Sequence, residues 1–209
     1  MDINAQATAT LALIARQLIC KIVYISTDYV FDGRGDSPWT PKNMTNPGNV
    51  YGVSKRAGED LVRVITNQHF IIRTQWLFGK NGKNFVKTMI NLSKTMDWID
   101  VVNDQYGRPT YTVDLAKFIC EIIDSNKYGI YHVTNEGRYV SWAEFATTIM
   151  KKIHSNAFIF GISTEDYAYH KHLAFRPRNG RLDTSKIIFE ELKPLPDWED
   201  ALERYLREI

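Results

Sequence analysis

The sequence lacks the features that mark several specialised classes of protein. Its 209 residues include no apolar run near the ~18 residues that cross a bilayer, and residues 1–6 lack the basic segment that opens a secretion signal. Lysine and arginine (26) barely outnumber aspartate and glutamate (24), and the basic residues are scattered, which disfavours a basic surface for nucleic acid. Internal repeats and low-complexity tracts are absent. We therefore expect a cytoplasmic protein that binds neither nucleic acid nor a membrane.

Cysteines and paired metal ligands are also scarce. The two cysteines, Cys20 and Cys120, lie in apolar stretches, which predicts that both thiols pack as small hydrophobes. This usage fits a reducing compartment. Of the five histidines, only His170 and His172 have the spacing of a pair, and a loop explains that spacing. The sequence therefore indicates no metal site.

What is present is an alternation of helical and extended patterns. A content of 44% hydrophobic and 24% charged residues can bury a substantial core. Strands that alternate with helices predict the α/β class, with a parallel sheet covered on both faces. Periodicity predicts helices at 4–18, 50–65, 84–95, 113–125, 142–153 and 197–207, and strands at 21–26, 70–73, 99–102 and 130–134.

A long loop interrupts this alternation. Residues 28–49 are rich in glycine, proline, asparagine and aspartate and contain no periodic pattern. Loops of about twenty residues inside a compact domain usually have a function. We therefore expect this loop to contribute to a functional site.

A tyrosine and a lysine at the start of the helix 50–65 form the first candidate site. Tyr51 and Lys55 are four residues apart, so a helix places them on one face, about one turn apart. A neighbouring ammonium lowers the pKa of a phenol from its reference of about 10, and such a tyrosine can protonate a developing alkoxide. Tyr167 and Lys171 share the spacing, so spacing alone does not choose between the two pairs.

The sequence context favours the first pair. The strand before it ends in Ser26, Thr27 and Asp28, at the carboxyl end where open α/β sheets bind ligands, whereas no such strand precedes Tyr167. An apolar stripe on the helix is predicted to face the core, with Tyr51 and Lys55 roughly opposite. The stripe comprises Val53, Ala57, Leu61 and Ile65.

These residues allow two interpretations. Thr27, Tyr51 and Lys55 suit carbonyl and alcohol chemistry as a hydroxyl, a phenol and an ammonium. A tyrosine at a helix start beside an ordinary surface lysine is the structural alternative. From the residues alone, both stay open.

Several motifs, in this order along nearly the whole chain, resemble the extended short-chain dehydrogenase/reductases. Within them the likeness is to the dTDP-4-dehydrorhamnose reductase family. The motifs are 26–33 (STDYVFDG), 47–59 (PGNVYGVSKRAGE), 73–79 (RTQWLFG), 82–87 (GKNFVK), 104–110 (DQYGRPT) and 176–179 (RPRN).

The resemblance implies a fold in two interleaved parts. It implies a Rossmann-like parallel sheet that lacks its first strands, with a smaller C-terminal substrate domain. Residues 1–73 and 112–134 would form the partial cofactor domain, and residues 74–111 and 135–209 the sugar-nucleotide domain.

The resemblance also implies a reaction. NADPH or NADH would reduce the C4 carbonyl of dTDP-4-dehydro-L-rhamnose. Tyr51 would be the acid, Lys55 would bind the nicotinamide ribose and lower the pKa of Tyr51, and Thr27 would hydrogen-bond the carbonyl oxygen. Asp28 and Trp76 would contact the sugar, although Asp28 also suits a loop cap and Trp76 a core position.

Other residues in the shared motifs have two possible roles. Asn84 and Phe85 would touch the nucleotide or simply start a helix, and asparagine favours the helix start. Arg108, Arg176 and Arg178 would bind the diphosphate or be solvated in loops.

One departure from the family is large. The chain has no Gly-x-Gly-x-x-Gly turn for a pyrophosphate, since Pro38 follows Gly33 and Gly35 at the third position. Measured against the family, roughly the first seventy residues with three strands are missing, which predicts an unpaired strand edge. We therefore expect weak dinucleotide binding by this chain alone and a possible homo-oligomer.

Two alternative functions stay open. The chain could be a non-catalytic binding homologue of the same fold, or it could be an epimerase or dehydratase that acts on another sugar nucleotide.

Overall fold

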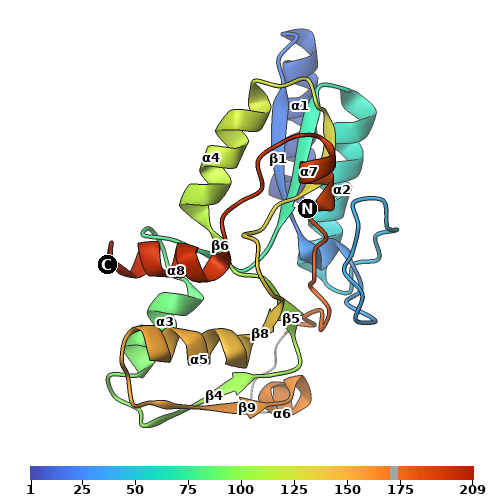
Figure 1. Ribbon diagram of the computed structural model, residues 1–209. Coiled ribbons are helices and arrows are strands. Elements are labelled where there is room, and N and C mark those ends of the chain that lie inside the picture. The colour runs from blue at the N-terminus through green and yellow to red at the C-terminus, as the bar shows by residue number, and fades with distance from the viewer. Residues whose placement is uncertain (170–173) are drawn as a thin grey trace.

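A three-stranded parallel sheet forms the upper part of the molecule in the computed structural model, which describes residues 1–169 and 174–209 (Figure 1). Its strand order is β1-β2-β7, with β1 at Ile22–Thr27, β2 at His69–Thr74 and β7 at Gly129–His132. Thr27 pairs with Thr74, and Arg73 pairs with His132. Because the strands are parallel, their carboxyl ends meet at one edge of the sheet. The predicted α/β class with a parallel sheet is confirmed.

Helices cover both faces of this sheet. Phe70 and Ile72 of β2 pack with Leu115 and Phe118, which belong to α4 (Thr112–Ile123). The intervening Ile71 points to the opposite face, as strand geometry requires, and packs with residues of α1 (Thr8–Gln17) and α2 (Val50–Ile65). A π-helical segment, Asp2–Ala7, precedes α1, and α7 (Ser185–Phe189) lies against β7.

The lower part of the molecule is built on a second parallel pair of strands (Figure 1). There β4 (Trp98–Val102) pairs with β9 (Phe158–Ile162). Its core brings together α3 (Phe85–Leu92), α5 (Trp142–Lys152) and α8 (Trp198–Leu206). The remaining elements are α6 (Thr164–Tyr169), the pair β3 (Leu77–Phe78) and β6 (Thr110–Tyr111), and the pair β5 (Tyr106–Gly107) and β8 (Val140–Ser141).

The two parts exchange chain segments several times. Ile187 and Leu195, which the sequence places with the substrate domain, pack in the same core as β2 and α4. The division into residues 1–73 with 112–134 and residues 74–111 with 135–209 stays a prediction.

The long helices and main strands were predictable, whereas the short strands were not. The helix predicted at 50–65 is α2, Val50–Ile65. The strands β3, β5, β6 and β8 have two residues each, too few for a periodic pattern. The strand β9 was missed although its aromatic, β-branched sequence is typical of a strand.

The predicted apolar stripe of α2 is wrong. Val53 is exposed and Ala57, Leu61 and Ile65 are half-buried, whereas the buried positions are Gly52, Ser54, Gly58, Glu59 and Val62. Two contacts rotate the helix in this way. Glu59 forms a buried ion pair with Arg73, with Nη2 to Oε2 at 2.6 Å, and Gly58 approaches the Tyr24 hydroxyl so closely that a β-carbon would lie 2.3 Å from it.

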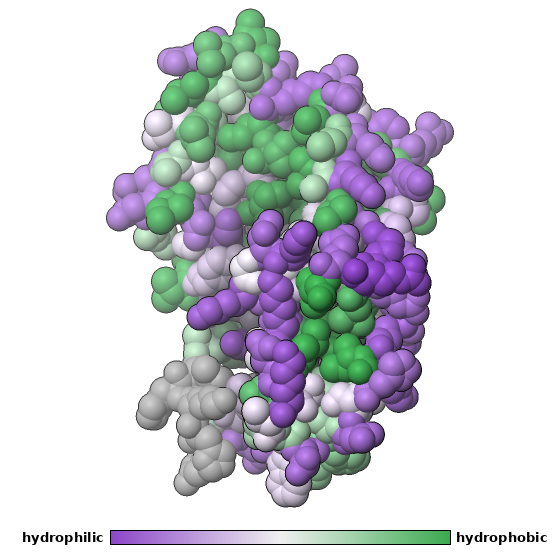
Figure 2. Space-filling view, turned by 90° about the vertical axis from the view of Figure 1, so that its left-hand side faces the viewer, coloured by the Kyte–Doolittle hydropathy of each residue, from purple (hydrophilic) through white to green (hydrophobic). Residues whose placement is uncertain are grey.

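The predicted packing of the two cysteines is also wrong, because both Cys20 and Cys120 are exposed. Leu18 and Ile19, next to Cys20, are exposed as well, and apolar side chains gather at this upper end of the molecule (Figure 2). Among the described residues, β1 pairs only with β2. The free edge expected for this strand is confirmed.

Within residues 1–169 and 174–209, the structure contains no helix of the length and apolarity needed to cross a membrane.

Candidate functional site

The carboxyl end of β1 carries two buried polar side chains. Thr27 and Asp28 are 6% and 3% exposed. The Thr27 hydroxyl donates to Oδ1 of Asp28 at 3.0 Å and accepts a hydrogen bond from the backbone N–H of Tyr29 at 3.2 Å. This second bond caps a short 3₁₀ turn, Asp28–Val30. The turn therefore fixes the position of the Thr27 hydroxyl at the edge of the sheet.

The start of α2 brings Tyr51 to this edge. Asn49 caps the helix by accepting from the backbone N–H of Gly52 at 2.7 Å. Gly52 lies so close to the turn that a β-carbon there would be 2.1 Å from the backbone oxygen of Tyr29. Tyr51 stands edge-on to the ring of Tyr29, with centroids 5.8 Å apart, and lies close enough to Thr27 for that side chain to lower its pKa. It is 48% exposed, so a ligand can reach its hydroxyl.

Lys55 lies one turn further along α2 and contacts β1 directly. Its Nζ donates to the backbone oxygen of Ile25 at 2.9 Å and lies 4.8 Å from the ring centroid of Tyr24. The structure thus brings Thr27, Tyr51 and Lys55 to the end of one strand.

The pKa of Tyr51 differs from the sequence prediction. Burial raises it, the hydrogen bond with Thr27 lowers it, and the charge of Asp28 raises it, so the net direction is upward. The prediction that Lys55 lowers the pKa of Tyr51 is wrong in this structure, because the ammonium group of Lys55 is turned to the backbone of Ile25. Burial lowers the pKa of Lys55 itself, and the charge of Glu59 raises it.

Asp28 has the most unusual titration in the site. Burial raises its pKa from 3.8 to about 7, although hydrogen bonds from Thr27 and from the backbone of Asp28 and Tyr29 offset part of the shift. Its carboxyl group therefore exchanges a proton near neutral pH.

Trp76 follows β2 at the same edge. Its φ of 49° is a left-handed value that non-glycine residues rarely adopt. The indole stacks on Trp142, with ring centroids 3.7 Å apart, and also packs near Phe145. Trp76 is therefore part of the aromatic core. The contact between Trp76 and the sugar stays a prediction.

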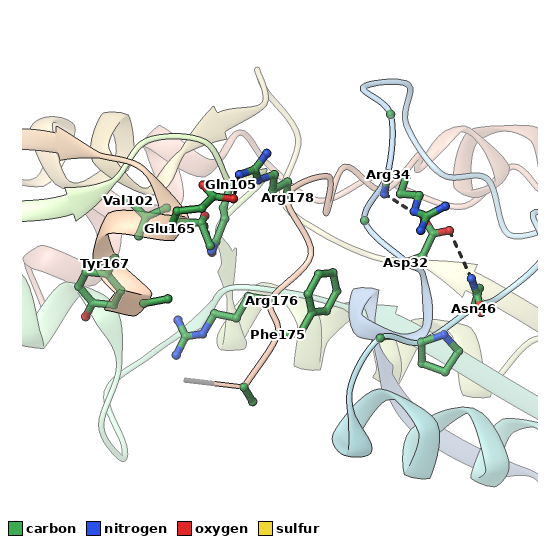
Figure 3. Close-up of a pocket in the computed structure, with 17 residues that line it drawn as sticks. Asp32, Arg34, Asn46, Val102, Gln105, Glu165, Tyr167, Phe175, Arg176 and Arg178 are labelled. Carbon is green, nitrogen blue, oxygen red and sulfur yellow. Dashed lines mark hydrogen bonds and ion pairs between the residues drawn. The ribbon is translucent and has the colours of Figure 1, made fainter. Parts of the chain in front are cut away.

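A cleft of about 1020 Å³ opens along the loop that follows β1, and Thr27, Tyr51 and Lys55 are not among the residues that line it. Figure 3 shows Asp32, Arg34 and Asn46 on one side and Glu165 and Tyr167 on the other, with Phe175 and Arg176 between them. The loop expected to be functional therefore lines the cleft through residues 32–35 and 46–48.

A second cavity of about 710 Å³ adjoins the first. The two share Val102, Gln105, Tyr167 and Arg176, and the second is lined by aromatic and apolar side chains of α3, β4 and α5. Phe85 is among them.

Asn84 caps α3 by accepting from the backbone N–H of Lys87 at 3.0 Å, so its predicted role as a helix start is confirmed.

The three candidate arginines have different environments. Arg108 is 4% exposed and pairs with Glu136 at 2.9 Å, so it is neither solvated nor free for a phosphate. Arg178 pairs with Asp104 and Glu165. Arg176 borders both cavities, and within the described residues it forms no ion pair.

The structure shows no metal-binding arrangement where it describes the chain. In residues 1–169 and 174–209, no three His, Cys, Asp or Glu side chains are grouped to hold a metal ion. His170, Lys171 and His172 lie outside the described residues.

Two features of the site were missed from the sequence. The buried pair of Glu59 and Arg73 lies beneath it, and Ser26, next to Thr27, donates to Glu59. The carboxamide of Gln75 is buried with no hydrogen-bond partner among the described residues. Glu59, Arg73 and Gln75 all lie in motifs that were recognised in the sequence. Their burial was missed because a local pattern does not show which distant residues pack together.

Comparisons with known proteins agree over the whole chain. Residues 1–209 match the family described as the RmlD substrate binding domain. The chain is 40% identical over 206 residues to the spore coat polysaccharide biosynthesis protein SpsK of Bacillus subtilis, covering 99% of this chain and 71% of that protein. It is 38% identical over 213 residues to the dTDP-4-dehydrorhamnose reductase of Aggregatibacter actinomycetemcomitans, covering 96% of this chain and 71% of that protein.

A solved structure is equally similar. The dTDP-4-dehydrorhamnose reductase of Bacillus anthracis in complex with NADP superposes with a TM-score of 0.93 at 40% identity, covering 99% of this chain and 72% of that one. Sequence motifs, strand-end geometry and these similarities agree. The chain belongs to the RmlD substrate-binding-domain family and is a homologue of the dTDP-4-dehydrorhamnose reductases.

Proposed function

We propose that this chain carries the catalytic and substrate-binding groups of a reductase that converts dTDP-4-dehydro-L-rhamnose to dTDP-L-rhamnose with a nicotinamide cofactor. One observation carries the proposal. The Thr27 hydroxyl, fixed by the Asp28–Val30 turn, and the half-exposed Tyr51 at the start of α2 both lie at the carboxyl end of the parallel strand β1. Two hydroxyl groups so placed can both reach one carbonyl oxygen.

The residues divide the reaction between them. Bound NADPH or NADH supplies a hydride to the C4 carbonyl carbon, and the electron pair of the C=O bond moves to the oxygen. Tyr51 gives its hydroxyl proton to that oxygen, and the Thr27 hydroxyl hydrogen-bonds it as the charge develops. The raised pKa of Tyr51 keeps the phenol in its protonated, donating form at neutral pH but also makes it a weaker acid.

The chain fits the nicotinamide end of the cofactor. Lys55 uses one N–H on the backbone of Ile25, so two of its three donors stay available for ribose hydroxyls. The bound NADP of the Bacillus anthracis relative supports NADPH as the cofactor, with NADH as the alternative. The described residues contain no glycine triplet for the pyrophosphate.

The two adjoining cavities suit a sugar nucleotide. Arg176 stands where they meet, and among the described residues no ion pair competes with a diphosphate for its guanidinium group. The aromatic and apolar cavity suits a nucleobase, and the larger cleft, which the loop after β1 lines through residues 32–35 and 46–48, suits the hexose. Asp28 and Trp76 are our candidates for contacts with the sugar.

Turnover and binding test the proposal separately. Oxidation of NADPH with dTDP-4-dehydro-L-rhamnose is followed for this chain alone and for the chain joined to the part of the Bacillus anthracis reductase that it does not span. We expect turnover in the joined protein and a loss of roughly 100-fold or more in Tyr51→Phe. Tyr128→Phe, the same change at a tyrosine that lines neither cavity, is the matched control and should keep full turnover. Unchanged turnover in Tyr51→Phe would contradict the assignment.

A non-catalytic binding homologue is the second candidate, and the orientation of Lys55, whose Nζ is turned to the backbone of Ile25, favours it. It predicts that dTDP-L-rhamnose binds to wild type and to Tyr51→Phe alike, while NADPH is not oxidised by either protein. Calorimetry and the turnover assay together distinguish the two functions.

A further inference from the structure

Tyr24 is a buried aromatic residue of β1 that contacts Lys55 and has no part in the proposed reaction. Nζ of Lys55 lies 4.8 Å from the centroid of the Tyr24 ring. The Tyr24 hydroxyl donates to the backbone oxygen of Lys55 at 3.2 Å. The same tyrosine therefore contacts Lys55 both at its backbone and at the charged end of its side chain.

The surrounding elements fix the position of this ring. The hydroxyl also lies 3.0 Å from the backbone oxygen of Asn4, and the ring packs with Ala12, Val62 and Ile71. A β-carbon on Gly58 would lie 2.3 Å from the hydroxyl oxygen and 2.7 Å from Cζ of the ring. The glycine therefore allows α2 to lie directly against Tyr24.

The ammonium group of Lys55 has few other partners. Its Nζ donates to the backbone oxygen of Ile25 at 2.9 Å, and in residues 1–169 and 174–209 it forms no ion pair. The carboxylate of Glu59, one turn further along α2, instead accepts hydrogen bonds from Ser26 and Arg73. A cation within about 6 Å of the centre of an aromatic ring is attracted to the face of that ring. The Tyr24 ring and one backbone oxygen therefore set the position of this half-buried ammonium group.

We propose that Tyr24 is a positioning residue whose ring holds the ammonium group of Lys55 near the carboxyl end of β1, ready for the nicotinamide ribose. A lysine side chain has many rotamers and loses this freedom when it binds a ligand. Holding Nζ in place beforehand reduces that loss, while two of its three N–H groups stay available for ribose hydroxyls. The effect on the cofactor rests on the proposed function, whereas the contact between Tyr24 and Lys55 does not.

NMR of the whole chain with labelled lysine tests the contact without any ligand. Protons that lie over the face of an aromatic ring resonate upfield, and Lys55→Arg identifies the signal of Lys55. We expect an upfield shift of its ε-methylene protons in wild type and in Tyr24→Phe, and an ordinary position in Tyr24→Leu. Lys186, whose Nζ lies 4.0 Å from the ring centroid of Tyr131, should stay shifted in all three proteins. An ordinary position for Lys55 in wild type would overturn the proposal.

Kinetics of the joined protein described above test the consequence for the cofactor. We expect Tyr24→Leu to raise the KM for NADPH roughly fivefold and to change kcat by less than about twofold, because the ring acts only through Lys55. Tyr24→Phe keeps the ring and should keep the wild-type KM. Equal losses in both variants would assign the role to the hydroxyl group and contradict the proposal. A lower KM in Tyr24→Leu would show that the ring holds Lys55 away from the cofactor, which also contradicts it.

A second lysine–tyrosine pair provides the matched control. Tyr131 is buried, contacts Lys186 and lines neither cavity, so Tyr131→Leu should leave the KM for NADPH unchanged. An equal rise in Tyr131→Leu would indicate general damage to the core and would count against Tyr24.

A fluorinated phenylalanine at position 24 replaces Tyr24→Leu if that variant does not fold. Fluorine keeps the shape of the ring but withdraws the negative charge of its face, so KM should rise with the number of fluorines. A constant KM would overturn the proposal. If wild type itself shows no turnover, the proposed function fails, while the NMR shift of Lys55 still decides whether Tyr24 holds it.

Discussion

The hydroxyl of Ser26 donates to Oε1 of Glu59 at 2.5 Å, which joins β1 to α2 one residue before Thr27. Glu59 also accepts from Nε and Nη2 of Arg73 at 2.9 and 2.6 Å. Arg73 lies 3.4 Å from Nε2 of His132 at the end of β7. One buried ion pair therefore connects the ends of all three parallel strands with the helix that carries Tyr51 and Lys55.

This arrangement predicts that Glu59→Gln destabilises the protein strongly. The variant leaves Arg73 as an uncompensated buried charge, which typically costs about 3–5 kcal/mol in the free energy of unfolding. Urea denaturation measures the loss. Asp60→Asn, on the same helix, removes the partner of the exposed Arg56 and Arg63 and should change stability little. Equal effects of the two variants would show that the buried pair has no special role.

The raised pKa of Asp28 predicts a pH-dependent stability difference between wild type and Asp28→Asn. A carboxyl group with a raised pKa in the folded state binds its proton more tightly there, so its stabilising contribution is complete below about pH 4 and is lost as the pH rises through about 7. Relative to Asp28→Asn, wild type should therefore lose up to about 4 kcal/mol of unfolding free energy across this window. Urea denaturation at a series of pH values measures this, and a difference that stays constant would contradict the prediction.

The exposure of Cys20 and Cys120 predicts that both thiols react in the folded protein. A thiol-specific reagent of the disulfide-exchange type should modify both without denaturant, at rates near those of the denatured chain. Cys20→Ser and Cys120→Ser identify each reaction. Protection of either thiol in the native protein would show that another surface covers that position.

The missing glycine triplet predicts weak binding of the dinucleotide to this chain. Lys55 and Tyr51 can hold the nicotinamide ribose, but the described residues supply no glycine-rich turn for the pyrophosphate. Calorimetry should therefore detect little or no binding of NADPH to the isolated chain. A micromolar Kd would refute this prediction and would place a pyrophosphate site elsewhere in the molecule.

Local pattern was informative where a residue's role depends on its neighbours in the sequence. The helix around Tyr51 and Lys55, the strand that ends in Thr27 and the N-cap at Asn84 all depend on short-range spacing. The orientation of α2 was mispredicted because a glutamate on a helix is ordinarily exposed, and only its distant partner Arg73 explains its burial. Arg108 is a similar case, since its partners Glu136 and Leu182 are far along the chain.

The sequence by itself determined the α/β class, the family and the small set of residues that suit carbonyl reduction, because periodicity and short motifs record local geometry. The tertiary structure decided which side of α2 faces the sheet, that Arg108 is buried against Glu136, and that the carboxamide of Gln75 is buried. These outcomes depend on burial and on contacts between segments distant in sequence, where the loss of hydration makes an ion pair or an unpartnered amide matter most.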